Sequence, residues 1–467
     1  MGPGTFKMMF LGLMLSGLPV AIAMAGASLI YVMVTGSVPQ YVVIHRMFGG
    51  LDSFPLLAVP FFILAGNLMN SAGITNRIYN FALALVGWMR GGLGHVNIVG
   101  SVIFAGMSGT AIADAAGLGT IEIKAMQDHG YSTEFSVGVT AASATLGPII
   151  PPSLPFVIYA LFANVSVGAL FLAGILPGAV MAILMMLTVA FYARRNKWGS
   201  DVPFHWPRVT KALIELTVVA GWPTAIWGAT QLGADPRTTV LLGLVGLFAA
   251  DRVFRFSAVL PIMTPVLLIG GMTTGLFTAT EGAIAACVWA LVLGLAWYRT
   301  LSWKMLVKAS MDTIETTAAV LFIVAAASIF GWMLTATRTT ELIAGWVLSV
   351  TQSPAGFLLL ANLLMLFVGC FLEPTAAITI LVPILLPIVN KLGIDPVHFG
   401  LVMVLNLMIG LLHPPMGLVL FVLARVARLS VERTTIAILP WLVPLLISLV
   451  IVTYIPAISL WLPNQFK

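Results

Sequence analysis

The sequence has little charge and almost no cysteine. Asp, Glu, Lys and Arg make up 8% of its 467 residues and hydrophobic residues make up 60%, whereas a soluble domain carries about 25% charged residues. The two cysteines, Cys287 and Cys370, lie in apolar segments, without the spacing of a disulfide framework or a metal site. The GxxxxGK(S/T) pattern of a phosphate-binding loop does not occur, which argues against an ATP-driven pump.

What the sequence contains instead is a series of long apolar segments. Each comes close to or exceeds the roughly 20 apolar residues that span a bilayer. The mean hydropathy of the chain is +1.07. We therefore expect an all-α polytopic membrane protein that is surrounded by the lipid bilayer. The segments are residues 8–34, 54–71, 135–163, 168–193, 256–275, 282–297 and 439–460.

The basic residues gather in a few segments of the chain. Lys and Arg outnumber Asp and Glu by 22 to 16, which gives a net charge of +6. By the positive-inside rule, loops with these clusters face the cytoplasm. The basic balance therefore indicates membrane orientation, and we expect no nucleic-acid partner. The clusters lie at 194–197, 208–211, 252–255, 299–308 and 425–433.

Two segments of the chain repeat one pattern, SATLGPIIPP at 143–152 and NLMIGLLHPP at 406–415. From Gly130 to Pro151 is 21 residues (151 − 130), and from Gly393 to Pro414 is also 21 residues (414 − 393). Proline in a helix interior removes a donor and clashes with the preceding turn, so both segments predict a broken helix. The same offset aligns two further pairs, Ser143 with Asn406 and Gly147 with Gly410.

Each half also contains a pair of apolar arms upstream of its broken helix. Residues 96–107 are 12 in number, and at about 1.5 Å per residue they cannot cross about 30 Å of hydrocarbon. A turn at 106–109 lets 110–126 return, and 357–372 with 375–391 form the corresponding pair. Counting crossings from a cytoplasmic N-terminus gives the two hairpins opposite orientations and a periplasmic C-terminus. This predicts two inverted-topology repeats, each with a re-entrant hairpin and a broken helix.

Broken helices at membrane depth are typical of transport sites. Irregular backbone is tolerated there only where it lines a cavity or is buried in protein. Exposed carbonyl oxygens suit Na⁺, and the N-termini of half-helices favour an anionic group. The alternative is a proline kink that only adjusts packing. Because four prolines at 148, 151, 152 and 155 are partly repeated in the second half, we favour a binding site.

We expect the two hairpin tips and the two breaks to meet near the midplane of the membrane. The candidate binding residues are small or polar residues at these tips and breaks. For the hydroxyl residues the alternative is helix packing; for Glu373 it is helix capping, and for His413 hydrogen bonding to nearby backbone. We interpret Asp114 as a helix-start charge, with a place in the ion path as the alternative, and Glu281 as interfacial. The substrate- and ion-binding candidates are Ser108, Gly109, Thr110, Ser143, Thr145, Gly147, Pro151, Glu373, Thr375, Asn406, Gly410, His413 and Pro414. Two or more Na⁺ ions are expected near Ser108, Ser143, Thr145, Gly147, Thr375, Asn406 and Gly410.

Several motifs along the chain resemble the large membrane subunit of TRAP (tripartite ATP-independent periplasmic) transporters. They include GMSGTAIADAAGLGTIEIKAM, TAASATLGPIIPPS, GLFTATEGA and LEPTAAITILVPILLPI, and they run from 60–67 to the YIPAISLWLP ending. The resemblance implies an elevator-type, Na⁺-driven importer of an organic anion in a bacterial inner membrane. It also implies two partners, a small four-helix membrane subunit and a periplasmic substrate-binding protein. The HPP break, the LEP tip and the YIPAISL ending resemble the C4-dicarboxylate subgroup.

The repeats and the resemblance together predict how the chain is divided. Residues 217–256 form an apolar pair that is additional to the family pattern. The chain begins at the first span, so we expect the small subunit to be a separate chain. The expected segments are scaffold or arm helices at 1–95, transport-domain elements at 96–163, a scaffold helix with the basic loop and the additional pair at 164–255, scaffold or arm helices at 256–354, transport-domain elements at 355–424 and a C-terminal helix at 425–467.

Three alternative functions stay open at this point. A stand-alone Na⁺/dicarboxylate symporter of the same superfamily would need no binding protein. An intramembrane hydrolase would need paired aspartates or a Ser–His dyad, and Ser143 with His413 has no supporting motif. A passive channel would show conductance far above carrier turnover. We expect a transporter without organic cofactor, and no enzyme.

Overall fold

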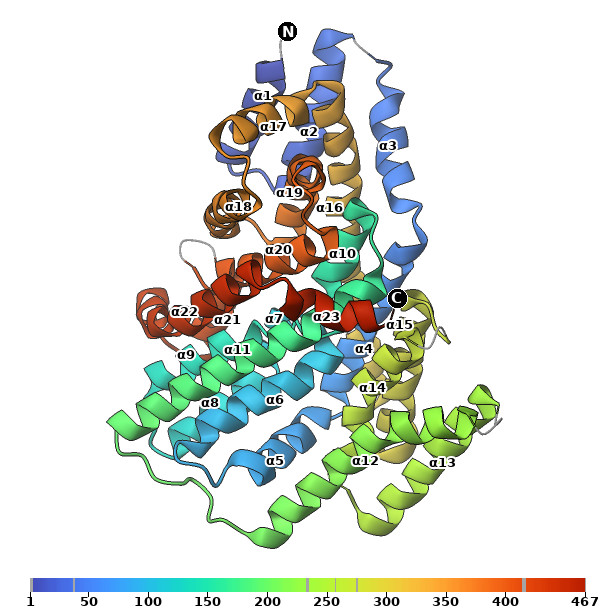
Figure 1. Ribbon diagram of the computed structural model, residues 1–467, viewed down its shortest axis with the longest axis vertical. Coiled ribbons are helices and arrows are strands. Elements are labelled where there is room, and N and C mark those ends of the chain that lie inside the picture. The colour runs from blue at the N-terminus through green and yellow to red at the C-terminus, as the bar shows by residue number, and fades with distance from the viewer. Residues whose placement is uncertain are drawn as a thin grey trace.

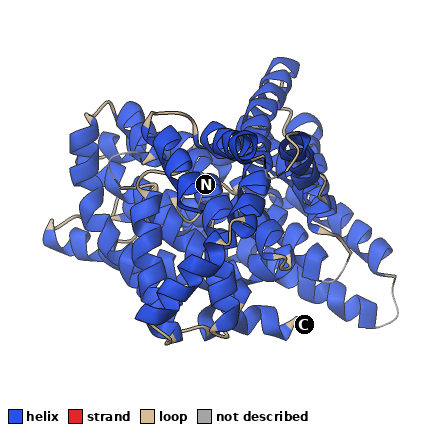
Figure 2. Cartoon of the chain, turned by 90° about the horizontal axis from the view of Figure 1, so that it is seen from above, coloured by secondary structure: helices blue, strands red, loops and turns tan. Residues whose placement is uncertain are grey.

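A computed structural model describes residues 3–36, 38–231, 235–256, 258–273, 276–413 and 417–466 of the chain. Within these ranges the regular structure is helical (Figures 1 and 2), apart from one isolated antiparallel bridge between Arg90 and Ser200. Six of the described helices are long and apolar enough to cross a membrane. The predicted all-α polytopic membrane architecture is confirmed.

The N-terminal apolar segment is two helices rather than the single span expected over 8–34. Helix α1 (Pro3–Leu15) and α2 (Val20–Thr35) are separated by a turn in which Gly17 has a φ of +86° and Pro19 precedes α2. The rings of Phe6 and Tyr31 lie 5.5 Å apart, which joins the start of α1 to the end of α2 in an antiparallel pair. The expectation of one crossing here was wrong, because the left-handed glycine and the proline stop a helix inside an unbroken apolar run. The orientation of the termini, which rested on that crossing, stays a prediction.

The first repeat contains a hairpin followed by an interrupted helix. The hairpin's return arm is itself divided at Gly117, a break that the sequence analysis did not predict. The elements are α3 (Tyr41–Leu51), the short 3₁₀ segment η1 (Phe54–Leu57), α4 (Ala58–Ser71), α5 (Ile74–Val86), α6 (Gly92–Ser108), α7 (Ala111–Ala116), α8 (Leu118–Asp128), α9 (Thr133–Ala144), α10 (Leu154–Ala163) and α11 (Val167–Arg195).

The second repeat keeps the register of the first. Helix α9 starts at Thr133 and its counterpart α20 at Pro396, 263 residues later (396 − 133); α10 and α21 start 264 residues apart (418 − 154). The apolar pair that the sequence predicts over residues 217–256 corresponds to α12 and α13. The elements are α12 (Trp206–Gln231), α13 (Pro236–Phe254), α14 (Val259–Thr273), α15 (Ala279–Leu291), the π-helical η2 (Val292–Trp297), α16 (Trp303–Ala336), α17 (Thr339–Val350), α18 (Pro354–Gly369), α19 (Pro374–Lys391), α20 (Pro396–Gly410), α21 (Leu418–Ala427), α22 (Val431–Tyr454) and α23 (Ala457–Gln465).

The two repeats pack into each other. Helix α10, the second half of the first interrupted helix, packs against α19 of the second hairpin, and α21 packs against α7 of the first hairpin. One continuous hydrophobic cluster contains residues from both hairpins and both interrupted helices. The long helix α16 packs on α2, α3, α4 and α19 (Figure 1). Because the second half of each interrupted helix packs on the hairpin of the other repeat, the two interruptions lie in the same core.

A short loop after α11 holds the base of the first hairpin. One carboxylate oxygen of Asp201, Oδ2, accepts hydrogen bonds from the Leu93 backbone N–H at 2.9 Å and the Tyr131 hydroxyl at 2.6 Å. Burial and the neighbouring Asp201 raise the pKa of the Tyr131 phenol, so the phenol stays a donor at neutral pH. The Gly91 N–H also donates to the Gly199 carbonyl at 3.0 Å. The loop therefore joins the start of α6 to the turn between α8 and α9.

Replacing Asp201 with alanine is expected to destabilise the protein without touching the interruptions. Two donors lose their acceptor, at a cost of about 1–3 kcal/mol. A thermal unfolding scan of the purified protein should show a melting temperature several degrees lower. Asp128→Ala removes an exposed carboxylate at the end of α8 and is the matched control. Equal melting temperatures for both variants would contradict the role given to Asp201.

Candidate functional site

The first interruption, residues 145–153, lies between α9 and α10. The prolines at 148, 151 and 152 lack the N–H that would continue a helix. Ser153 starts the next half-helix, because its Oγ accepts a hydrogen bond from the Phe156 N–H at 3.3 Å and donates to the Pro148 carbonyl at 2.5 Å. Pro151 is buried within the interruption. The break predicted from the proline run is confirmed.

The tip of the first hairpin contacts this interruption through backbone. Gly109 has a φ of +65°, and a Cβ placed on it would lie 2.7 Å from the Pro152 carbonyl oxygen. A Cβ on Gly147 would lie 3.0 Å from the Thr110 carbonyl oxygen. Gly109 therefore cannot carry a side chain without a shift of the backbone, and Gly147 leaves very little room for one. The structure therefore brings together the first tip and the first break, as the sequence analysis proposed.

The second interruption follows α20, and the second hairpin contacts it at its own pair of glycines. Helix α20 ends at Gly410 and α21 begins at Leu418, which confirms that this helix also ends near its prolines. A Cβ on Gly410 would lie 2.8 Å from the Gly369 Cα. His413 is half-buried, and its Nδ1 lies 3.0 Å from the Ile409 carbonyl oxygen. Of the predicted site residues, Pro414 lies outside the described residues.

At the second tip, Glu373 caps the helix that follows. Its side chain accepts from the Ala376 N–H at 3.2 Å and from the Thr375 hydroxyl at 2.8 Å. Thr110 has the corresponding place at the first tip and accepts from the Ala113 N–H at 3.3 Å. Glu373 therefore caps α19. The cap is compatible with the predicted binding role, because it leaves the carboxylate at the N-terminus of α19, and that role stays a prediction.

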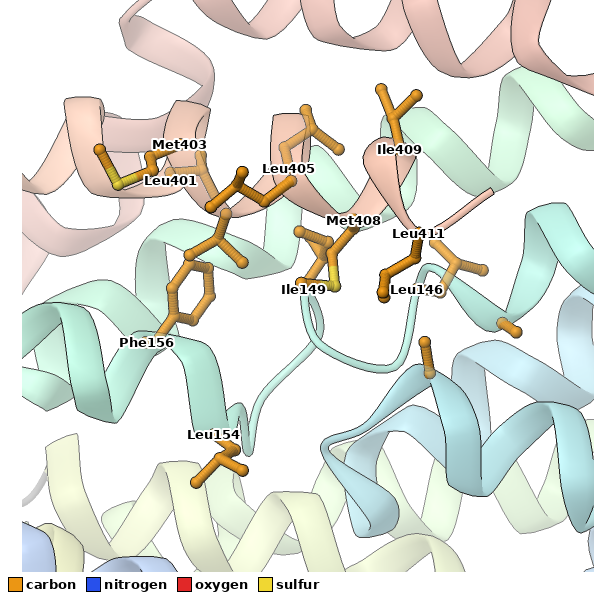
Figure 3. Close-up of a cluster of buried hydrophobic side chains, with 14 of the residues drawn as sticks. Leu146, Ile149, Leu154, Phe156, Leu401, Met403, Leu405, Met408, Ile409 and Leu411 are labelled. Atoms are coloured by element: carbon orange, nitrogen blue, oxygen red, sulfur yellow. The ribbon is translucent and has the colours of Figure 1, made fainter. Parts of the chain in front are cut away.

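The first interruption lies directly against α20. Leu146 and Ile149 of the interruption belong to the same buried cluster as Met408 and Leu411, and Figure 3 shows these four side chains beside one another. Helix α21 reaches α7 on the hairpin that the first interruption contacts. The candidate residues of both repeats thus lie around one shared core.

Two of the predicted ligand residues carry a polar atom that is free to bind. Ser108 is 6% exposed and Asn406 is fully buried. Within the described ranges, Ser108 Oγ and Asn406 Oδ1 have no hydrogen-bond partner. Buried polar atoms are normally paired, and hard oxygen ligands suit Na⁺. By contrast, the Thr145 hydroxyl donates to the Ala142 carbonyl at 2.6 Å, within its own turn.

The structure adds two asparagines that the sequence analysis missed. Asn97 on α6 accepts a hydrogen bond from the Ser143 hydroxyl at 2.7 Å, and Asn362 on α18 accepts one from Asn406 Nδ2 at 2.8 Å. In each repeat, the first arm of the hairpin is therefore bonded to the residue four positions before the glycine of the break. A polar residue inside an apolar segment was the available signal.

Both asparagines continue into buried polar networks. Asn97 Nδ2 donates to Glu122 Oε2 at 2.6 Å and to Thr140 Oγ1 at 2.8 Å. Asn362 Nδ2 donates to Thr453 Oγ1 at 3.1 Å, and through this contact the second network reaches α22. The Ser143 hydroxyl is thus engaged with Asn97, which gives the Ser143–His413 dyad of a hydrolase no support.

Two buried carboxyl groups lie in the return arm of the first hairpin. Asp114 is in the first turn of α7, as predicted, but it is only 1% exposed, and its Oδ2 has no partner among the described residues. Glu122, which was not predicted, is also 1% exposed. Glu281 is exposed and forms a capping box with Thr278, and its interfacial position stays a prediction.

Comparison with known proteins identifies the family. Residues 7–458 match the family described as Tripartite ATP-independent periplasmic transporter, DctM component. This chain belongs to that family. The sialic acid TRAP transporter large permease protein SiaM of Vibrio cholerae is 41% identical over 461 residues, which cover 98% of this chain and 97% of the relative. The C4-dicarboxylate TRAP transporter large permease protein DctM of Rhodobacter capsulatus is 32% identical over 470 residues, with 98% and 97% covered.

The fold of this large permease subunit is also similar to a solved membrane transporter. The crystal structure of YdaH from Alcanivorax borkumensis superposes with a TM-score of 0.57 at 15% identity, covering 91% of this chain and 90% of that chain. The chain is a transmembrane transporter subunit and not an enzyme. Since the two relatives are named for different substrates, similarity alone does not single out the predicted C4-dicarboxylate subgroup.

Proposed function

We propose that this permease imports a carboxylate anion across the bacterial inner membrane, driven by Na⁺ and dependent on a binding protein. The observation that supports this proposal is the pair of contacts between a hairpin and an interruption, Gly109 with Pro152 and Gly369 with Gly410. Each places broken backbone inside the membrane protein, where carbonyl oxygens can hold a cation. Sialic acid and C4-dicarboxylates, for which the two relatives are named, are both carboxylates. A C4-dicarboxylate or a related carboxylate is therefore the proposed cargo.

The membrane potential explains why the import of an anion needs coupling cations. Each negative charge moved inward opposes a membrane potential by about 2.3 kcal/mol per 100 mV. A dianion therefore needs two Na⁺ to be carried without electrical cost and a third to gain from the potential. The two unpartnered oxygens, Ser108 Oγ and Asn406 Oδ1, lie one in each repeat and are the side-chain ligands that we assign to Na⁺.

The proposed mechanism moves the site as a body. The segments 96–163 and 355–424, which contain both hairpins and both interruptions, slide against the remaining helices as an elevator. A periplasmic substrate-binding protein delivers the anion, and a small membrane subunit completes the scaffold. A stand-alone symporter of the same superfamily is the competing function. Uptake by proteoliposomes without any binding protein, at the rate seen with it, would favour that alternative.

Removal of Na⁺ is expected to abolish uptake. Proteoliposomes containing this chain and its small subunit, supplied with the binding protein and labelled substrate, should accumulate substrate with an inward Na⁺ gradient and show only background in choline buffer. Uptake that persists in choline would contradict Na⁺ coupling. An ionic current that exceeds carrier turnover would instead indicate a channel.

Ser108→Ala tests the ion ligand separately from the fold. The hydroxyl has no partner among the described residues, so its removal breaks no hydrogen bond. We expect the Na⁺ concentration for half-maximal uptake to rise about tenfold, equivalent to about 1.4 kcal/mol, with an unchanged melting temperature. Ser28→Ala, on α2, removes a buried hydroxyl that donates to the Met24 carbonyl, and it should leave the Na⁺ requirement unchanged.

A further inference from the structure

Helices α13, α14 and α15 border a cavity that the proposed transport cycle does not use. The cavity lies between α13, α14 and α15 and has a volume of about 400 Å³. Its walls are apolar and aromatic, with Phe248, Phe277 and Trp289 among the lining residues. Figure 1 shows α13 in the lower part of the molecule, away from α1 and α17 at the top, with α14 and α15 above it. The cavity volume is in the range typical of a small-molecule site.

Exposed apolar side chains border the cavity. Val288 and Val292 line it from α15 and the start of η2 and are 54% and 37% exposed. On α13, the neighbouring Leu241 and Val245 are 62% and 66% exposed. In a membrane protein such an exposed apolar face contacts the acyl chains of lipids, which are as apolar as the side chains themselves. The cavity can therefore be filled from the bilayer.

Basic residues follow the cavity-lining part of α13 at its C-terminal end. The rings of Phe248 and Trp297 lie 4.7 Å apart, and the Arg252 guanidinium lies 5.7 Å from the centre of the Trp297 ring. Arg252 and Arg255 are exposed, while the adjacent acid, Asp251, is buried and accepts from Trp297 Nε1 at 2.8 Å. The apolar wall thus continues through Phe248 and Trp297 to the Arg252 guanidinium, and Arg255 follows it at the end of the same helix. The neighbouring carboxylate of Asp251 faces inward.

Inside the cavity there is also a polar atom without a partner. Thr264 on α14 lines the cavity and is 2% exposed, and among the described residues its Oγ1 has no hydrogen-bond partner. A hydroxyl in a threonine-containing membrane helix commonly donates to a carbonyl of its own helix. The Thr264 hydroxyl has no such partner among the described residues, so a hydrogen-bond donor is left unused in the buried part of the wall.

We propose that this cavity binds an anionic phospholipid, with one acyl chain among the aromatic residues and the phosphate against Arg252 and Arg255. The apolar lining matches the acyl chain, the Thr264 hydroxyl matches an ester oxygen, and the two arginines match the phosphate. A transmembrane helix of another subunit is about 10–12 Å across with its side chains, so it is too wide for a cavity of about 400 Å³. A flexible chain fits where a helix does not.

Native mass spectrometry of the full chain purified with its small subunit in mild detergent tests the proposal. The probe lipids are phosphatidylglycerol and phosphatidylcholine, added back separately after delipidation. Wild type should retain one phosphatidylglycerol at least fivefold more strongly than phosphatidylcholine. Arg252→Gln with Arg255→Gln should remove this preference, and Ala286→Phe, which fills the cavity from its buried wall, should reduce retention of both lipids.

Two matched controls show whether a loss of lipid is specific to the cavity and its arginines. Arg433→Gln changes an exposed arginine outside this region, and Ala319→Phe enlarges an exposed alanine of α16; both should retain lipid as wild type does. Equal retention by all variants with unchanged melting temperatures would overturn the proposal. The proposal would also be overturned if Ala286→Phe lost the small subunit but retained lipid as wild type does. The cavity would then be a contact between subunits. If Ala286→Phe does not fold, the double arginine variant alone decides by the loss or persistence of the preference.

Discussion

Asn97→Ala is expected to lower substrate uptake at least tenfold while most of the protein remains folded. The substitution removes the acceptor of the Ser143 hydroxyl and the donor to Glu122 and Thr140, all of which are buried. Leaving a buried polar group unpaired costs about 1–3 kcal/mol for each group. The break before Gly147 would then be free to shift relative to the hairpin. Uptake in proteoliposomes and the melting temperature are the two measurements.

The effect on uptake must be separated from a loss of stability. A double-mutant cycle of Asn97→Ala with Ser143→Ala isolates the contact between hairpin and break, since coupled residues depart from additivity. We expect clear coupling in the Na⁺ concentration for half-maximal uptake. Asn390→Ala, at an exposed site near the end of α19, should behave as wild type. Additive effects in the cycle would show that Asn97 stabilises the fold without positioning the break.

Gly410→Ala is expected to reduce uptake about tenfold or more. The added Cβ would lie 2.8 Å from the Gly369 Cα, and because the obstructing atoms belong to the backbone, no side-chain rotation can relieve the contact. Overpacking of a buried contact costs about 1–3 kcal/mol. The second hairpin would be pushed away from the break that we assign to Na⁺ binding.

A control glycine tests whether the position or the residue type matters. A Cβ added to Gly345 on α17 would meet no described atom within 4 Å, so Gly345→Ala should keep wild-type uptake and melting temperature. Wild-type uptake by Gly410→Ala would contradict the close packing of Gly369 and Gly410 during transport. A fall in melting temperature with normal uptake per folded protein would confine the contact to stability.

The sequence predicted the fold correctly where a single residue type determines the local backbone structure. Proline removes a donor wherever it stands, so the interruptions after Ala144 and Gly410 followed from composition and spacing. The spacing of 21 residues to the Pro-Pro pairs also anticipated the shared register of α9–α10 and α20–α21. The two N-terminal helices were missed, because apolarity alone does not reveal an antiparallel turn around Gly17.

The sequence predicted only part of the candidate site. The contact of Gly109 with Pro152 agreed with the expected meeting of tip and break. Asn97 and Asn362 were missed, because their partners lie 46 and 44 residues away and no local periodicity records such a pair. Which hydroxyls are engaged and which are free, as in Ser143 and Ser108, also depends on these distant partners.

By itself, the sequence determined that this protein lies in a membrane and that its two halves carry matching broken helices, since hydropathy and proline act through the chain's own backbone. Only the tertiary structure decided that α10 packs on α19 and α21 on α7, and which oxygens remain unpartnered at the breaks. The helix packing joins segments hundreds of residues apart, and the hydrogen bonds at the breaks join residues 44 and 46 positions apart. At both distances, side-chain volume and hydrogen-bond geometry select one arrangement.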